Sequence, residues 1–183
     1  VTVRGFGRLD GDEGFAEVFF DEAFVADNAV AGGVVLGEPE RGWAVAMATA
    51  GSERGLTLRS PGRFVVTAEK LVALAQERGD AVMRRRAATA WMHADAYQQH
   101  TLATVTRLAA GAKPGAEASL TKLWWSELDI ELHQLALDLL GPDAELEGPW
   151  SKAWQFSLSG PIYAGTNEIQ RNIAAERLLG LPR

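Results

Sequence analysis

The sequence contains no cysteine, and this absence excludes both a disulfide framework and a thiolate metal site. Histidine is scarce as well. His93, His100 and His133 lie far apart and lack the spacing of metal ligands, so we expect ordinary helix-surface or packing residues and no metal site. No apolar run is long enough to span a membrane, and no signal peptide is visible, so we expect a cytoplasmic protein.

Basic residues are too few for a nucleic-acid-binding protein. The 183 residues include 18 lysines and arginines against 24 aspartates and glutamates, which gives a formal net charge of −6. Because non-specific binding to nucleic acid depends on clustered positive charge, we expect no nucleic-acid partner. The length is sufficient for one or two domains with a sizeable core.

The first part of the chain, residues 1–38, has the pattern of short β-strands. Apolar and polar residues alternate in "VTVRGF", and glycines separate the segments. Two or three strands do not form a stable sheet alone, so we expect the end of a larger β domain. The sequence begins at Val1, without methionine and within a strand-like pattern, which predicts a piece of a longer protein. "GEPERG", residues 37–42, has the composition of a linker.

The rest of the chain, residues 39–183, has the period of α-helices. Residues 43–78 predict a helix with a kink or break at Pro61 and Gly62. Asp80 is a suitable N-cap for the next helix. Further helices are expected over residues 80–111, 116–140, 151–158 and 167–179. The fold class is therefore mainly α, an antiparallel helical bundle preceded by a few strands.

The helix over residues 116–140 is apolar over a wide arc, so we expect it to be covered on most sides. Trp124 and Trp125 on this helix are interpreted as core, with the lining of a ligand channel as the alternative. "MRRRAA" holds Arg84–Arg86, which we interpret as a charged helix face; a phosphate contact is the alternative.

The stretch "IYAGTNEIQR", residues 162–171, opens the last helix with small and hydrogen-bonding residues. Thr166 or Asn167 is expected to cap the helix, and Glu168 suits its positive end. A helix start with free N–H groups also suits an anionic or polar ligand.

Several segments together resemble the flavin-dependent acyl-CoA dehydrogenases. "FAEVFFDEAFV" is similar to the last strands of their middle β domain, and "GW" followed by "SERG" to the start of their first C-terminal helix. "EASLTKLWWSELDIELHQLALDLLGP" resembles their third C-terminal helix. "IYAGTNEIQRNIAAERLLGLPR" is the most specific match. The resemblance covers the whole chain but only about the C-terminal half of a typical member. The resemblance implies that residues 1–38 are the end of the middle β domain and that residues 39–183 are the C-terminal helical domain.

The resemblance implies a definite reaction. Members of this family bind FAD and oxidise acyl-CoA thioesters to trans-2-enoyl-CoA. A glutamate removes the α-proton, and a hydride leaves the β-carbon for the flavin. Electrons then pass to an electron-transfer flavoprotein. The thioester carbonyl is polarised by hydrogen bonds, one of them from a backbone N–H near the signature loop, which stabilises the developing enolate.

Many members carry the base immediately before the Gly-Thr of the signature loop, where this chain has Ala164. In isovaleryl- and long-chain-like members the base comes instead from a Glu-Arg pair on the first C-terminal helix. "GSERG" supplies that pair, so the resemblance assigns Glu53 as the base, with a solvated surface glutamate as the alternative. Arg54 is assigned to the substrate site, with orientation of Glu53 or a buried ion pair as the alternatives.

The resemblance also assigns the residues of the signature loop. Ala164 keeps a backbone N–H for the thioester carbonyl and leaves room for the Glu53 carboxylate. Gly165 lies by the thioester. Thr166, Asn167 and Glu168 are assigned to FAD.

Two departures from the family pattern concern FAD contacts with a neighbouring subunit. The Arg-x-x-Phe-Gly stretch is missing from "QERGDAVMRRRAATAW", and "LGPDAEL" replaces the Gly-Gly-x-Gly turn. Both resemble an actinobacterial subgroup in which two different chains form a heterotetramer that acts on steroid thioesters. The alternative function is therefore a non-catalytic assembly subunit, and a homo- or heterotetramer through the helical domain is expected.

Overall fold

The computed structural model describes residues 1–26, 33–55, 59–113 and 115–182, with the side chains of residues 51–55 outside the description. The chain forms two compact units, Val1–Arg54 and Gly55–Arg183. Each unit is described by itself below. The expected domain boundary after residue 38 concerns the whole protein and stays a prediction.

The first unit contains an antiparallel hairpin of β1 (Thr2–Gly7) and β2 (Glu13–Phe19). Phe6 pairs with Phe15, and their rings stack with centroids 5.9 Å apart. Every residue of both strands is exposed, so the hairpin buries no core of its own. The two antiparallel strands agree with the sequence analysis, and their membership in a larger β domain stays a prediction.

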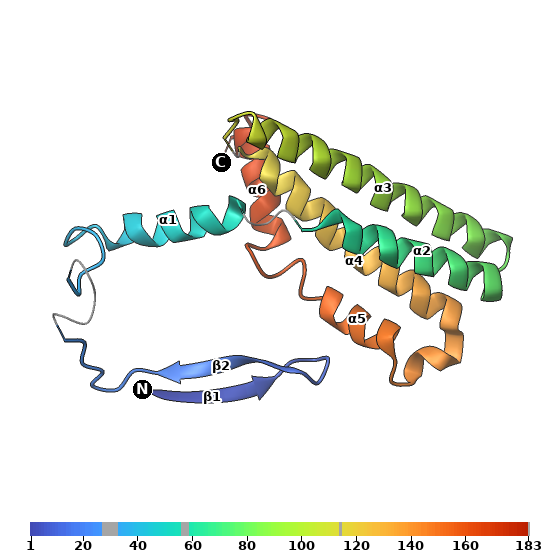
Figure 1. The fold of residues 1–183 in the computed structure, drawn as a ribbon, viewed down its shortest axis with the longest axis horizontal. Helices are drawn as coiled ribbons and strands as arrows, with labels where there is room; N and C mark the ends of the chain where they lie inside the picture. Colours follow the sequence, from blue (N-terminus) through green and yellow to red (C-terminus); the bar gives the residue numbers. More distant parts are fainter. Residues whose placement is uncertain (27–32, 56–58, 114, 183) are drawn as a thin grey trace. The chain divides into compact units, whose positions relative to one another are not determined.

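The expected break at Pro61 and Gly62 separates two helices. The helix α1 spans Gly42–Gly55, and α2 spans Pro61–Arg78 (Figure 1). Pro61 is the first residue of α2, where a missing N–H costs nothing because the first N–H groups of a helix have no partner within it. Proline therefore starts this helix rather than bending a longer one.

Helices α2 and α3 (Ala81–Ala109) lie side by side as an antiparallel pair (Figure 1). Small side chains at their contact are fully or almost fully buried: Ala68, Ala75, Ala87, Ala90 and Ala94. Asp80 caps α3, as expected, by accepting a 2.8 Å hydrogen bond from the N–H of Met83. Gly79 is required at the turn because a Cβ there would lie 2.7 Å from the carbonyl oxygen of Ala75.

The helix α4 (Glu117–Leu140) is the centre of the second unit. It contacts α2, α3, the 3₁₀ helix η1 (Gly141–Glu145), α5 (Pro149–Ser157) and α6 (Asn167–Arg177) (Figure 1). This arrangement confirms the expectation that α4 is covered on most sides. None of the described helices combines the length and apolar character that crossing a membrane requires.

The core of the bundle forms where α2, α3 and α4 meet. Phe64, Tyr97, Trp125 and Leu132 are at most 1 % exposed, and the ring of Tyr97 packs edge-on against that of Phe64. Trp125 is thus core, as expected. Trp124 is half-buried and lies against Tyr97 at the edge of the core.

Removal of a core side chain should test this packing. We expect Leu132→Ala to lower the free energy of unfolding by roughly 2–5 kcal/mol, because it removes buried methyl groups and leaves a cavity. Leu179→Ala, at a position 72 % exposed, is the matched control and should change it little. Urea unfolding of both variants measures the difference. Equal losses would contradict the central position of α4.

Candidate functional site

A stripe of buried polar residues runs along α4. Lys122, Ser126, Asp129 and His133 follow one another at intervals of four, three and four residues, and all are at most 5 % exposed. This spacing places them on one face of the helix. We call these four residues the polar stripe. Each of them contacts a neighbouring segment or the helix backbone through a hydrogen bond or ion pair.

The N-terminal half of the polar stripe holds the first residue of α6. The ammonium of Lys122 donates to the Oδ1 of Asn167 at 2.6 Å, and the hydroxyl of Ser126 donates to the same oxygen at 3.1 Å. Burial lowers the pKa of Lys122, and Glu168 and Glu127 partly oppose this effect. The backbone N–H of Asn167 donates to the carbonyl oxygen of Pro161 at 2.8 Å, which closes the loop before α6.

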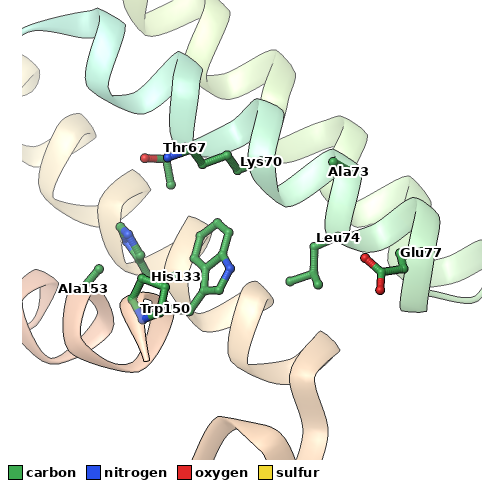
Figure 2. Close-up of a pocket in the computed structure, with 9 residues that line it drawn as sticks. Thr67, Lys70, Ala73, Leu74, Glu77, His133, Trp150 and Ala153 are labelled. Carbon is green, nitrogen blue, oxygen red and sulfur yellow. The ribbon is translucent and has the colours of Figure 1, made fainter. Parts of the chain in front are cut away.

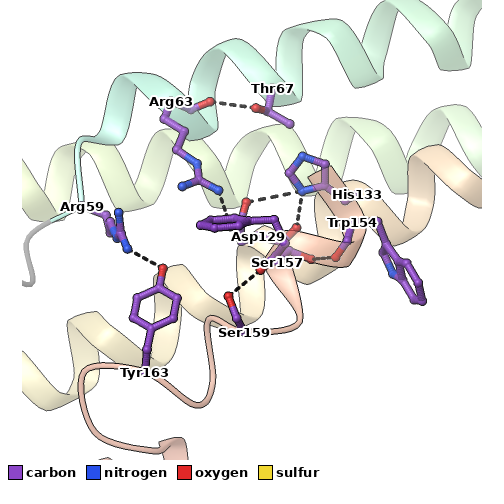
Figure 3. A network of polar contacts seen from close by, with 10 residues as sticks. Arg59, Arg63, Thr67, Asp129, His133, Trp154, Ser157, Ser159 and Tyr163 are labelled. Carbon is purple, nitrogen blue, oxygen red and sulfur yellow. Dashed lines mark hydrogen bonds and ion pairs between the residues drawn. The ribbon is translucent and has the colours of Figure 1, made fainter. Parts of the chain in front are cut away.

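The C-terminal half of the polar stripe holds α2. The guanidinium of Arg63 forms an ion pair with the carboxylate of Asp129 (Figure 3). The Nδ1 of His133 lies 2.7 Å from the carbonyl oxygen of Asp129 and 3.4 Å from its Oδ1. Because a buried carboxylate is costly unless it is paired, the Arg63–Asp129 ion pair holds α2 against α4, while the His133 contacts lie within α4.

A third contact holds the segment that precedes α6. The guanidinium of Arg59 donates to the hydroxyl of Tyr163 (Figure 3). It also lies over the ring of Trp125, 5.2 Å from its centroid. The hydroxyl of Tyr97 in turn donates to the carbonyl oxygen of Arg59 at 3.0 Å. Burial raises the pKa of Tyr163, and Arg59 partly opposes this effect. Tyr163 immediately precedes Ala164, so this contact anchors the signature loop.

The loop itself has an unusual backbone. Ala164 and Gly165 both have positive φ, 55° and 84°, the left-handed region that glycine enters readily and alanine does not. We call residues 164–166 the elbow. Thr166 ends it as the N-cap of α6, accepting from the N–H of Ile169 at 3.4 Å, as expected. Its hydroxyl and the backbone N–H of Glu168 itself hold the pKa of the exposed Glu168 carboxylate below its ordinary value, with the N–H the larger cause.

The backbone N–H groups of the elbow are potential hydrogen-bond donors to a ligand. Within the described part of the chain, no acceptor is bonded to the N–H of Ala164 or Gly165. Gly165 is exposed, and the positive end of α6 begins directly after the elbow. Such a helix start, with free N–H groups, can hydrogen-bond a carbonyl or anionic oxygen.

A separate hollow lies between α2, α4 and α5 (Figure 2). Its volume is about 500 Å³, and Trp150 and His133 pack edge-on inside it with ring centroids 5.8 Å apart. Its other lining residues are Thr67, Lys70, Ala73, Leu74, Glu77, Pro149 and Ala153. Of the site residues assigned from the sequence, none whose side chain the structure describes lines this hollow. Among the described residues, no cluster of histidine and acidic side chains is arranged to hold a metal ion.

Comparison with known proteins covers the helices and the elbow in a single match. The sequence model of the acyl-CoA dehydrogenase C-terminal domain matches residues 40–179, which include α1 to α6 and the elbow. The chain belongs to the acyl-CoA dehydrogenase family.

The relatives in sequence include acyl-CoA dehydrogenases from mycobacteria, and the similar solved structures include a complex of two different chains. The acyl-CoA dehydrogenase IpdE1 of Mycolicibacterium smegmatis is 38 % identical over the whole chain, which spans 46 % of that relative. One chain of the ChsE4–ChsE5 complex from Mycobacterium tuberculosis superposes with a TM-score of 0.77 at 24 % identity, over 100 % of this chain and 49 % of that one. The Tcur3481–Tcur3483 steroid ACAD superposes with a TM-score of 0.77 at 21 % identity, and the match covers 100 % of this chain and 49 % of that one. The chain thus spans about half the length of its relatives.

The site residues assigned from the family resemblance lie in two different parts of the chain. Ala164, Gly165 and Thr166 form the elbow, and Glu168 follows it on the exposed side of α6. Glu53 and Arg54 occupy the last turn of α1 in the first unit, and their side chains lie outside the described residues. Their roles stay predictions.

Asn167 differs from the other residues assigned to FAD. It is 3 % exposed, and its side chain is turned inward to Lys122 and Ser126. The sequence analysis missed these two partners, although polar residues at helical spacing within an apolar helix are a detectable signal. It also missed Gln170, a buried residue one turn into α6 that contacts the elbow.

The Lys122–Asn167 contact predicts a stability effect. We expect Asn167→Ala to lower the free energy of unfolding by about 1–3 kcal/mol or more, because it removes an acceptor from a buried charged group. Asn172→Ala, on the exposed side of the same helix, is the matched control and should change it little. Chemical unfolding at neutral pH measures both. An Asn167→Ala variant as stable as the control would show that Lys122 does not depend on this amide.

Proposed function

We propose that the protein containing this chain catalyses the FAD-dependent α,β-dehydrogenation of an acyl-CoA thioester to trans-2-enoyl-CoA. The observation that carries this proposal is the elbow at the start of α6. The N–H groups of Ala164 and Gly165 have no acceptor among the described residues, in a family whose substrates contain a thioester carbonyl. A donor held at that place stabilises the negative charge that develops on the carbonyl oxygen when the α-proton leaves.

In this proposal Glu53 takes the α-proton. Ala164 has a methyl group where many members carry a carboxylate, so the elbow supplies no base of its own. Glu53 is the carboxylate that the family's second arrangement places on α1, and Arg54 lies beside it in the sequence. A desolvated pocket raises the pKa of a carboxyl toward neutrality, which suits a general base.

Bound FAD would supply the acceptor for the hydride that leaves the β-carbon. The described residues fit such a group in part. Thr166 is partly accessible, and Glu168 is exposed beside the free N–H groups of the elbow. The side chain of Asn167 is occupied by Lys122 and Ser126, which favours a role in holding the start of α6. We therefore assign Thr166 and Glu168 as the residues that would contact the cofactor.

Similar proteins support a proposal for the substrate class and the partners. The structural neighbours include a steroid ACAD and a complex of two different chains, so we propose a steroid-type thioester and a heteromeric assembly through the helical unit. Exposed apolar side chains on α3, among them Trp91, Met92 and Leu102, support association through the bundle. An electron-transfer flavoprotein is the proposed acceptor of the electrons.

A second function is a non-catalytic subunit that stabilises a flavin-bearing partner. The missing Arg-x-x-Phe-Gly stretch and the "LGPDAEL" segment favour it, because both regions concern FAD contacts across subunits. The colour of the purified full-length protein separates the two functions. A yellow preparation that acyl-CoA bleaches supports the enzyme, whereas a colourless protein that binds a flavin-bearing chain supports the assembly subunit.

Glu53→Gln in the assembled enzyme tests the base. Glutamine keeps the shape of the side chain and loses its basicity, so we expect flavin to stay bound and its reduction by substrate to slow by about 100- to 10,000-fold. Glu69→Gln, at an exposed carboxylate on α2, is the charge-matched control, and flavin in this variant should be reduced at the wild-type rate. Anaerobic stopped-flow absorbance measures both. A Glu53→Gln variant with wild-type reduction would refute the assignment.

A further inference from the structure

The elbow needs a side chain that holds its backbone. Ala164 lies at φ 55° and Gly165 at φ 84°, so two consecutive residues are in the left-handed region. Alanine does not prefer this conformation, because its Cβ approaches a backbone carbonyl oxygen there. Such a backbone persists only where its surroundings determine it.

Gln170 contacts the elbow from one turn into α6. Its side chain is buried, with 3 % of the residue exposed. Its Nε2 donates to the carbonyl oxygen of Ala164 at 3.2 Å and to that of Gly165 at 3.4 Å. Glycine suits position 165 because of its φ, and a Cβ there would lie 2.6 Å from the same nitrogen and would displace the Gln170 amide.

These two hydrogen bonds decide where the elbow's N–H groups point. In a planar trans peptide the C=O and the N–H point in opposite directions. When Gln170 holds the carbonyl of Ala164, the N–H of Gly165 is turned away from the interior of the bundle. When it holds the carbonyl of Gly165, the N–H of Thr166 is turned away in the same manner. Gln170 also restrains the backbone of Ala164, whose own N–H has no acceptor among the described residues.

We propose that Gln170 is a positioning residue that fixes the elbow's peptide planes so that their N–H groups face a substrate carbonyl oxygen. This inference rests on the proposed function, because it takes the thioester carbonyl as the acceptor. Gln170 touches neither substrate nor cofactor in this role. It acts through the carbonyl groups of Ala164 and Gly165, and the N–H groups of Gly165 and Thr166 in the same two peptide planes polarise the substrate carbonyl while the α-proton is removed.

Two variants of Gln170 in the assembled, flavin-loaded protein test the proposal. Gln170→Met keeps the length of the side chain and removes the donor. Gln170→Glu presents a carboxylate to two carbonyl oxygens at neutral pH, but its protonated form regains one O–H donor. Gln76→Met and Gln76→Glu, at an exposed position on α2, are the matched controls.

The first readout is the infrared stretch of an acyl-CoA labelled with ¹³C at the thioester carbonyl. Hydrogen bonds to the oxygen lower this frequency, so we expect bound substrate to show a higher frequency in Gln170→Met than in wild type. The second readout is kinetic. We expect kcat to fall about 10- to 100-fold with a smaller change in KM, because a misplaced donor weakens the stabilisation of the transition state more than the binding of substrate.

The pH profile separates positioning from simple structural support. Activity of Gln170→Glu relative to wild type at the same pH should rise as the pH is lowered, while that of Gln170→Met should stay constant. Wild-type kcat and carbonyl frequency in both variants would overturn the role of Gln170 and leave the proposed function intact. Loss of folding in both variants, measured by thermal unfolding, would also overturn it. A wild-type protein that binds no acyl-CoA would refute the proposed function itself.

Discussion

The ammonium of Lys122 is almost wholly removed from solvent, and the position of the start of α6 depends on it. A buried charge must be hydrogen-bonded where it lies, so Asn167 has to reach into the bundle to Lys122 and Ser126. Asn167 fixes one end of the loop that joins Tyr163 to α6. Arg59 fixes the other end through the hydroxyl of Tyr163, so the chain must turn within the three residues between them. The left-handed elbow is the result. The N–H groups on which the proposed chemistry rests therefore depend on polar contacts between α4 and the start of α6.

Much of the fold was predictable because its signals are local. The N-cap Asp80, the proline that starts α2 and the apolar period of α4 each act within a few residues, and α3, α4 and α6 begin and end within two residues of their expected bounds. The contacts of the site are not local. Arg59 and Tyr163 are 104 residues apart in the sequence, and Lys122 and Asn167 are 45 apart. No periodicity links such pairs, so only the packed bundle shows which polar residues meet.

The location of the elbow was predictable from the sequence, but its backbone conformation was not. Gly165 signals a turn, and Thr166 signals a helix start, so the location was expected. The positive φ of Ala164 was not expected, since alanine disfavours it. Ala164 was interpreted as a vacancy for the carboxylate of Glu53. The structure adds that Ala164 occupies a constrained backbone position in contact with Gln170, so both its small size and its conformation serve the elbow.

We propose that in the assembled protein the elbow hydrogen-bonds the thioester carbonyl and Glu53 removes the α-proton. A crystal structure of the assembled protein with a non-reducible acyl-CoA analogue tests this most directly. We predict the thioester oxygen about 2.7–3.1 Å from an N–H of the elbow and the Glu53 carboxylate within about 3–3.5 Å of the α-carbon. A thioester bound away from residues 164–166, or a different carboxylate beside the α-carbon, would contradict the account.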